Sequence, residues 1–206
     1  MEIQFSPVIL QEEPVPADYA GCKTCDLQRK RNRLIWGEGN PDAPLYIILD
    51  NPGAREDKEG NPFICGARQT LQKAAYESGI NLDDLYFTYV LKCKPTLRYD
   101  REAVIQTCMP YIEKQIQLKN PKLAFCLGNN AVRWFFKDME TDVKSLRGVW
   151  HTVRGLPTAV SYHPIAIRRR PNLINVFMQD WAMVAERLAH PAICYSNSSG
   201  LLHNND

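Results

Sequence analysis

The sequence predicts an α/β protein with three layers (αβα), in which helices cover both faces of a central, mostly parallel, four-stranded sheet. Four short apolar segments, at 45–50, 85–92, 122–128 and 157–162, alternate along the chain with amphipathic segments. Each apolar segment is continuous, as is typical of parallel strands that are covered on both faces. Strands that alternate with helices in this way indicate a three-layer architecture.

The amphipathic segments supply the predicted helices. One covers 68–78 and stops at Gly79, a second follows Asp100, which is a good N-cap residue, and a short third covers 129–136. Apolar residues recur at helical spacing in the second helix and again near the end of the chain. They are Val104, Cys108, Tyr111, Ile112 and Ile116, and then Leu173, Val176, Phe177, Trp181, Val184 and Leu188.

We expect one domain over 21–190, an extended N-terminal arm over 1–20 and a polar tail over 191–206. The arm contains Pro7, Pro14 and Pro16, and the tail includes the polar stretch NSSGLLHNND. A chain of 206 residues can bury about 70 % of its surface without disulfides.

Composition predicts a cytoplasmic protein that does not enter a membrane, and it gives no reason to expect an oligomer. The net charge is +2, and no apolar run approaches the roughly 20 residues that span a bilayer. The N-terminus lacks the basic and small-residue segments of a secretory signal. Positive charge is concentrated at 27–33, 92–101 and 168–171. Such clusters either bind phosphates or are ordinary solvated faces.

Seven cysteines in a cytoplasmic chain are not expected to form a disulfide framework. Four thiolates are a full ligand set for a tetrahedral zinc or an iron–sulfur cluster. The candidates are a CxxC pair, one cysteine after a strand and one on the next helix: Cys22, Cys25, Cys93 and Cys108. The wide split of the second pair favours [4Fe–4S] over a zinc ribbon. Spacing alone also allows the second pair, like Cys126, to be buried packing residues.

Three of the predicted strands end in residues that can carry chemistry. Asp50 closes the first, Gly128 and Asn129 follow the third, and His163 follows the fourth. Ligands of open α/β sheets bind beyond the carboxyl ends of the strands. We therefore expect one crevice at which Asp50, Asn129 and His163 meet.

The stretch YHPIAIRRRP combines a histidine, apolar residues and a run of arginines. Pro164 biases His163 towards an extended backbone, and a short loop then combines two isoleucines with three arginines. Arginines that hold phosphates beside an aliphatic wedge are typical of proteins that displace a base from a duplex. Taken alone, His163 is more simply a structural histidine, and the surrounding residues favour the functional interpretation.

Several motifs together resemble family 4 uracil-DNA glycosylases. The segment CKTCDLQRKRNRLIWGEGNPDAPLYIILDNPG resembles the opening of that family, which has a CxxC, a basic segment, GEGNPDAPL, a strand and an acid–Xaa–Pro–Gly turn. GNPF resembles the family's GRPF, VLKCKP its VVKCRP, CLGNNAV its LGxxA, VKSLRGVWH its LRG segment and YHPIAIRRR its HPAxxLR. These motifs follow one another in the same order as in the family, over about residues 20–188.

The resemblance implies a DNA glycosylase that excises uracil from single- or double-stranded DNA, and a mainly structural [4Fe–4S] cluster on Cys22, Cys25, Cys93 and Cys108. It also assigns site residues by role. The catalytic residues are Asp50, Asn51 and His163, the base-binding residues are Gly53, Phe63 and Tyr89, and the DNA-binding residues are Arg147, Ile165, Ile167, Arg168 and Arg169.

Two positions depart from the family pattern. The family has Glu where this chain has Asp50, which is shorter by one methylene and is expected to act through a water. The family also has Asn where this chain has Tyr89, so a donor and an acceptor are replaced by one hydroxyl on a large ring. We therefore expect these departures to change which base is recognised more than they change the glycosylase chemistry.

Three classes of function compete. The leading hypothesis is a monofunctional glycosylase, which releases uracil or a related modified pyrimidine without cutting the strand and so initiates base excision repair. The second is a glycosylase-fold protein that binds a base or DNA with little catalysis. The third, an iron–sulfur electron carrier, explains the cysteines and leaves YHPIAIRRR and GNPF without a purpose.

Overall fold

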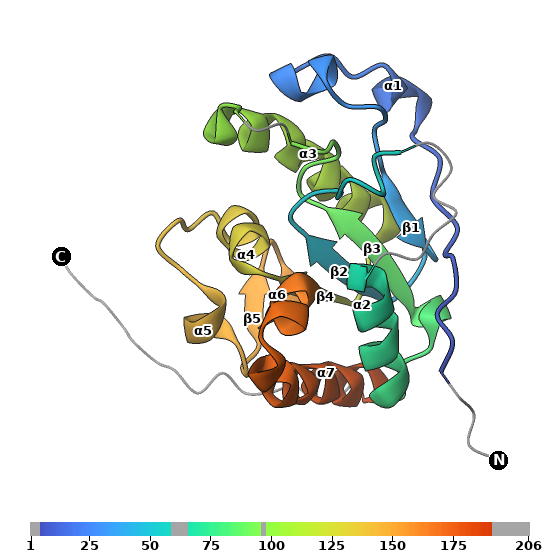
Figure 1. Ribbon diagram of the computed structural model, residues 1–206, viewed down its shortest axis with the longest axis vertical. Helices are drawn as coiled ribbons and strands as arrows, with labels where there is room; N and C mark the ends of the chain where they lie inside the picture. The colour runs from blue at the N-terminus through green and yellow to red at the C-terminus, as the bar shows by residue number, and fades with distance from the viewer. Residues whose placement is uncertain (1–4, 59–65, 96–97, 191–206) are drawn as a thin grey trace.

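A computed structural model describes residues 5–58, 66–95 and 98–190, and these form a six-stranded mixed sheet with helices on both faces (Figure 1). The four predicted strands are its parallel centre. They are β2 (Leu45–Leu49), β3 (Leu85–Tyr89), β4 (Leu123–Leu127) and β6 (Leu156–Ser161). The three-layer prediction is confirmed, but the predicted count of four strands is too low, because an antiparallel strand lies at each edge. The edge strands are β1 (Gly37–Gly39) and β5 (His151–Val153).

Alternate residues of β2 face the two helical layers. Ile48 packs in a buried cluster with α3 (Arg101–Lys119) and α4 (Asn129–Phe136). Ile47 and Leu49 pack in a second cluster, on the opposite face. The helices of that face are α2 (Gly66–Glu77), α6 (Pro164–Arg169) and α7 (Ile174–Ala189). The central strands are therefore buried on both sides, which explains their continuous apolar sequences.

The predicted helices are present and have local causes. The Asp100 side chain accepts a hydrogen bond from the backbone N–H of Ala103 at 3.1 Å and caps α3, as predicted. The segment after His163 was expected to be a loop and is the helix α6 instead. Pro164 occupies its first turn, where a missing N–H costs nothing. The remaining helical segments are short: α1 (Ala17–Ala20), α5 (Val143–Leu146) and the 3-10 turns Asp26–Arg29, Leu82–Asp84 and Pro171–Leu173.

The strand order β1–β3–β2–β4–β6–β5 places the site. After β2 the chain crosses to β3 on one side, and after β3 it returns to β4 on the other side of β2. The crossover helices α2 and α3 lie on opposite faces of the sheet. Crevices form where strand order reverses in this way. The carboxyl ends of β2 and β4 therefore mark the expected binding position.

Residues of the N-terminal segment extend the sheet beyond β1 (Figure 1). The backbone N–H of Glu13 donates to the carbonyl of Gly37 at 2.9 Å, and that of Gly39 donates to the carbonyl of Gln11 at 2.8 Å. The Gln72 side chain bonds both the N–H and the carbonyl of Val8, at 2.9 and 2.8 Å. This segment therefore covers an edge that would otherwise be open to pairing with another chain.

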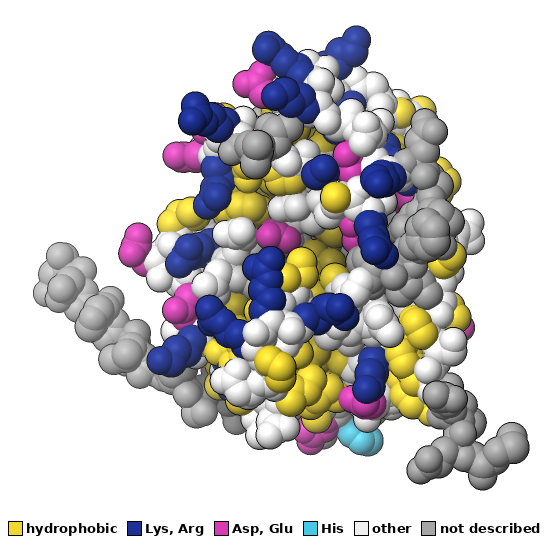
Figure 2. All heavy atoms as spheres, viewed as in Figure 1, with side chains coloured by type: hydrophobic (Ala, Val, Ile, Leu, Met, Phe, Trp, Pro, Cys, Tyr) yellow, Lys and Arg dark blue, Asp and Glu magenta, His cyan; other side chains and the backbone are white. Residues whose placement is uncertain are grey.

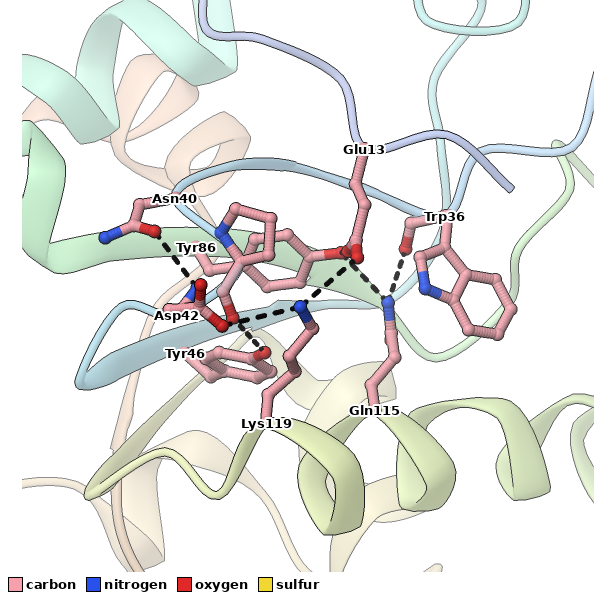
Figure 3. A network of polar contacts seen from close by, with 9 residues as sticks. Glu13, Trp36, Asn40, Asp42, Tyr46, Tyr86, Gln115 and Lys119 are labelled. Atoms are coloured by element: carbon pink, nitrogen blue, oxygen red, sulfur yellow. Dashed lines mark hydrogen bonds and ion pairs between the residues drawn. The ribbon is translucent and has the colours of Figure 1, made fainter. Parts of the chain in front are cut away.

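A buried polar network joins the N-terminal segment to the sheet and to α3 (Figure 3). The Tyr86 hydroxyl donates to Glu13, and the Gln115 amide donates to the Tyr86 oxygen and to the carbonyl of Trp36, both at 3.0 Å. Burial and the Glu13 carboxylate raise the pKa of Tyr86. The phenol therefore stays protonated, and the network is structural. Among the described residues, no helix is long and apolar enough to cross a membrane.

Candidate functional site

A cavity of about 530 Å³ opens beyond the carboxyl ends of the parallel strands. Its volume lies in the range of small-molecule sites, about 300–1,000 Å³. A larger cavity of about 680 Å³ lies between α3 and α4, away from the strand ends. The residues at the strand ends and turns of the 530 Å³ cavity are Asp50, Asn51, Gly53, Tyr89, Gly128, Asn129 and His163. The predicted crevice is therefore present, and it contains Asp50, Asn129 and His163 together.

Asp50 follows β2 and presents a half-buried carboxylate to this cavity. Its Oδ1 accepts the backbone N–H of Asn51 at 2.9 Å, and its Oδ2 lies 3.4 Å from the Asn130 amide nitrogen. The Nε2 of His163 is 3.7 Å from Oδ1. The carboxylate is thus oriented but only loosely held, and it can still accept bonds from a water or a sugar.

Asn51 and Gly53 shape the turn after Asp50. The Asn51 amide donates to the carbonyl of Pro52 at 2.9 Å, so this side chain is occupied by its own turn. A Cβ added to Gly53 would lie 2.6 Å from Oε2 of Glu56. The absence of a side chain at Gly53 therefore leaves room for the Glu56 carboxylate, which explains why a glycine stands at this position.

His163 caps α6 and enters the cavity from the end of β6. Its φ and ψ of −64° and 139° are extended, as the following proline predicts. Its Nδ1 accepts the backbone N–H of Ile165 at 3.2 Å, so the neutral ring carries its proton on Nε2, towards Asp50. Burial lowers the pKa of His163, and Asp50 and Glu56 only partly oppose this. The imidazole is therefore neutral at neutral pH and offers an N–H donor.

Gly128 allows the imidazole to reach this position. Its φ is +94°, and a Cβ there would lie 2.8 Å from the Cβ of His163. A side chain at residue 128 would therefore clash with the catalytic candidate and strain the backbone. Asn129 turns away from the pair, because its side-chain oxygen accepts the backbone N–H of Val143 at 3.0 Å.

Tyr89 ends β3 and is 2 % exposed. Its hydroxyl accepts a hydrogen bond from Nη2 of Arg68 at 2.8 Å. Arg68 in turn donates to the carboxylates of Glu38 and Glu56. We call this group the Arg68 cluster (Glu38, Glu56, Arg68 and Tyr89). Glu56, Arg68 and Tyr89 line the cavity, and Glu38 supports Arg68 from β1.

The other members of the Arg68 cluster, and Asn130, were not predicted as site residues. Arg68 appeared only as the start of a helix, and Glu38 only as part of a motif. A buried arginine has no distinctive sequence signal. The two acidic residues lie thirty and twelve positions from Arg68 along the chain, so only the fold brings them together.

Two of the three predicted DNA-binding arginines belong to α6, and they lie in different environments. Arg169 and the neighbouring Arg170 line the cavity, whereas Arg168 lies against Gly66 at the start of α2. Figure 2 shows Lys and Arg side chains around the middle of the face on which Figure 1 places α6.

Arg147, a predicted DNA-binding residue, has partners within the fold. Its Nε and Nη2 donate to the two carboxylate oxygens of Asp180 at 3.0 and 2.8 Å, and Nη2 also donates to the carbonyl of Val176. This guanidinium, held by three bonds, joins the end of α5 to α7.

The two predicted wedge residues also differ. Ile165 is 43 % exposed and lines the cavity, whereas Ile167 is 5 % exposed and packs in the core with Phe177. Their α6 positions face opposite ways, so only Ile165 stays a candidate for contact with DNA. Phe63, the predicted stacking residue, lies outside the described residues, as do Cys65 and Cys194.

The four candidate ligand cysteines approach one cluster of the core. Cys93 and Cys108 are each 2 % exposed, and the half-buried Cys22 and Cys25 pack against the same cluster. Among the described residues, no three His, Cys, Asp or Glu side chains form a group that could hold a metal ion. The fifth described cysteine, Cys126, is fully buried in β4 and is a packing residue, as predicted.

Polar groups that stabilise thiolates surround these sulfurs. Arg31 donates to Sγ of Cys93 at 3.2 Å and to the carbonyl of Cys22 at 2.7 Å, and the Tyr111 hydroxyl lies 3.1 Å from Sγ of Cys22. Burial raises the pKa of Cys93, which Arg31 partly offsets, and burial raises the pKa of Cys108 to about 12. An all-sulfur donor set with cationic and hydroxyl partners fits an iron–sulfur centre in kind.

Comparison with known proteins places the chain in a family. The model of the uracil DNA glycosylase superfamily matches residues 36–185. The chain is 31 % identical over 188 residues to a type-4 uracil-DNA glycosylase of Sulfurisphaera tokodaii, which covers 87 % of this chain and 86 % of that protein. It is 32 % identical to the type-4 enzyme of Saccharolobus solfataricus over 85 % of this chain and 86 % of that one. It is also 28 % identical to that of Archaeoglobus fulgidus, over 84 % and 92 %. The chain therefore belongs to the uracil DNA glycosylase superfamily.

Proposed function

We propose that this protein is a DNA glycosylase that hydrolyses the N-glycosidic bond of uracil, or of a related modified pyrimidine, and so starts base excision repair. The observation that carries the proposal is the pair formed by Asp50 and His163. Their carboxylate and imidazole come from the ends of β2 and β6 and lie 3.7 Å apart at the cavity. Type-4 uracil-DNA glycosylases with related sequences support the same chemistry.

The two residues meet opposite needs of the reaction. As the bond breaks, positive charge develops on the sugar and negative charge on the departing base. Asp50 stabilises the sugar or orients the attacking water, for which its loosely held oxygens are suited. The neutral His163 donates its Nε2–H to the base O2. A preorganised donor of this kind contributes about 10²–10³ in rate.

The surroundings of the pair suit a nucleotide drawn out of a DNA strand. Arg169 and Arg170 lie at the cavity where phosphates would pass, and Ile165 exposes an aliphatic side chain beside them. Displacing a base costs a few kcal/mol, which such phosphate contacts and an apolar filler offset. We assign DNA contact to Ile165, Arg168, Arg169 and Arg170, and we assign Arg147 a structural role.

The proposal is tested by base release from oligonucleotides that carry one uracil, either single-stranded or paired with G or A. Alkali reveals the abasic sites, and Asp50→Asn and His163→Ala are assayed in parallel. We expect release by the wild type, with no strand cleavage before alkali, and loss of release in both variants at nearly unchanged DNA affinity. Folded wild-type protein that binds these oligonucleotides and releases no base would instead support a binding protein.

We also propose that Cys22, Cys25, Cys93 and Cys108 hold a [4Fe–4S] cluster with a mainly structural role. Their convergence at one part of the core, and the hydrogen bonds from Arg31 and Tyr111, support this. When bound, the cluster would supply positive charge to thiols whose burial disfavours ionisation. The iron and sulfide content of purified protein tests it. Cys25→Ser should lose iron, and the matched control Cys126→Ser should keep it.

A further inference from the structure

The two carboxylate oxygens of Asp50 have different neighbours. Oδ1 accepts the backbone N–H of Asn51 at 2.9 Å and lies 3.7 Å from Nε2 of His163. Oδ2 instead accepts a hydrogen bond from the side-chain nitrogen of Asn130, at 3.4 Å. One oxygen therefore faces the imidazole that would hold the departing base, and the other faces the first turn of α4.

Asn130 reaches Asp50 from the strand that separates the two catalytic candidates. β4 lies between β2 and β6 in the sheet, and α4 begins directly beyond the end of β4, at Asn129. Asn130 is half-buried in the first turn of α4, and both Asn129 and Asp50 line the cavity. Asn130 therefore lies at the margin of the cavity, eighty positions along the chain from the carboxylate that it contacts.

The amide oxygen of Asn130 is free to accept a hydrogen bond. An asparagine side chain carries a donor nitrogen and an acceptor oxygen on one carbon. The nitrogen donates to Asp50, but over the described part of the chain the oxygen has no hydrogen-bond partner, and it is not enclosed in the core. The oxygen of the neighbouring Asn129, by contrast, accepts the backbone N–H of Val143 at 3.0 Å. The amide of Asn51 donates to its own turn. Asn130 is thus the side-chain amide that contacts the Asp50 carboxylate and still presents an acceptor beside it.

Two acceptors side by side can orient a nucleophilic water. A water whose two protons are held by Oδ2 of Asp50 and Oδ1 of Asn130 directs its lone pairs away from both. Hydrolysis also requires the water to approach the sugar in line with the breaking bond, from the side opposite the departing base. Oδ1 of Asp50 faces His163 and Oδ2 faces Asn130, so the carboxylate lies between these two sides.

We propose that Asn130 is a water-positioning residue, which holds Oδ2 of Asp50 through its amide nitrogen and the attacking water through its amide oxygen. This inference rests on the proposed function and deepens it, since it makes Asp50 act through a water. In the step, the water oxygen bonds to C1′ of the sugar, and the bond from C1′ to N1 of the base breaks with its electron pair passing to the base. One water proton passes to Oδ2 of Asp50. The base takes up a proton from solvent, which leaves a free base and an abasic sugar.

The first test is whether Asn130 and Asp50 act on the same water. Single-turnover rates are measured on a single-stranded oligonucleotide with one uracil, for Asn130→Ala, Asp50→Asn and the double variant. Asn130→Ala should lower the rate about 10²-fold at unchanged affinity for DNA, because a misplaced nucleophile affects only the chemical step. The double variant should be within about threefold of Asp50→Asn alone, because two residues that act on one water do not contribute independently.

The second test replaces the amide by a carboxyl group. In Asn130→Asp two ionised carboxylates would repel each other, so one of them takes up a proton more readily and then donates to the other, as the amide does. The rate of this variant relative to wild type should therefore rise about tenfold or more as the pH falls from about 8 to about 6. The other ionisable groups near Asp50 are His163, Cys126 and Glu56. They are present in both enzymes, so the ratio of rates removes their effect.

A matched control uses an asparagine far from the site. Asn81 is exposed before the amino end of β3, where its amide contacts Asp84 at 3.5 Å. Asn81→Ala should keep the wild-type rate at every pH. Thermal unfolding of each variant shows that it is folded.

The outcomes separate this inference from the function on which it rests. A slow Asn130→Ala, a double variant no slower than Asp50→Asn, and recovery of Asn130→Asp at lower pH support it. A wild-type rate in folded Asn130→Ala, or losses that multiply in the double variant, overturn the inference and leave the glycosylase function standing. No release of uracil by folded wild-type protein overturns both.

Discussion

Two aspartates near the same end of the sheet are held in different ways. Asp180 is 1 % exposed, and its carboxylate accepts two bonds from Arg147 and one from the Ser161 hydroxyl at 2.5 Å. Asp50 has a side chain that is 24 % exposed, with a backbone bond at 2.9 Å, an amide at 3.4 Å and an imidazole at 3.7 Å. Both carboxylates face a basic side chain, but only Asp180 is hydrogen-bonded to it. We call Asp180 with Arg147 the closed pair, and Asp50 with His163 the open pair.

The difference is the one expected between a structural carboxylate and one that we propose acts on a substrate. A buried carboxylate with short, complete hydrogen bonds has no capacity left for a ligand, so its removal affects folding. A carboxylate at a cavity with long contacts retains acceptor capacity, so its removal should affect chemistry. Contact geometry, and not residue type, distinguishes the two roles.

The largest expected effect is on the closed pair. Asp180→Ala should lower the free energy of unfolding by about 3–5 kcal/mol, because it leaves the Arg147 guanidinium partly buried without its counter-charge. Urea unfolding measures this. The double variant Arg147→Met/Asp180→Leu should recover most of the loss, and equal instability of the single and double variants would show that the ion pair is not the cause.

The open pair should respond in the opposite way. Asp50→Asn and His163→Ala should each reduce the rate of base release by about 10²–10³, or about 2.7–4 kcal/mol in activation free energy. Asp50→Asn should keep its free energy of unfolding within about 0.5 kcal/mol of wild type. His163→Ala should lose about 0.5–2 kcal/mol, because it removes the side chain that caps α6. Single-turnover kinetics and urea unfolding of the same preparations measure both. A large loss of stability in Asp50→Asn would remove the contrast with Asp180.

The two isoleucines of α6 extend the comparison to apolar side chains. Ile167→Val should cost about 0.5–1.5 kcal/mol of stability, because it deletes a buried methylene. Ile165→Val should leave stability nearly unchanged and weaken binding to uracil-containing DNA. Thermal unfolding and fluorescence anisotropy separate these effects. Equal stability of the two variants would contradict the burial difference.

The smallest effect concerns the charge of His163. Burial lowers its pKa, and the Asp50 carboxylate raises it in part, so Asp50→Asn should lower the pKa further. Proton NMR titration of the imidazole measures the shift, with Asp142→Asn as a control on an exposed carboxylate. A higher pKa for His163 in Asp50→Asn would contradict the contact.

The same pKa has a consequence for stability. The unfolded histidine titrates near its ordinary value of about 6.5, and the folded one titrates lower. Between these two pKa values the unfolded state binds more protons than the folded state. The free energy of unfolding therefore rises with pH through this range. The contribution of His163 is complete above about pH 6.5 and is lost below the folded pKa.

Much of the fold was predictable because its signals are local. The central strands are continuous apolar segments, Asp100 caps its helix through its own side chain, and Pro164 sets an extended backbone at His163. The positions of Asp50 and His163 at one crevice also follow, since parallel strands end at the same edge. The edge strands β1 and β5 could not be predicted in this way. Each has three residues, and they become strands only by pairing with β3 and β6.

The succession of strands and helices along the chain, and the chemical groups at the strand ends, follow from the sequence, because they depend on local periodicity and on chain direction. Three features depend on the three-dimensional fold: which arginine lines the cavity, which arginine pairs with Asp180, and which isoleucine of α6 is exposed. These outcomes depend on contacts between residues far apart in the chain. Burial and partner distance then decide whether a charged side chain stabilises the fold or remains available to a substrate.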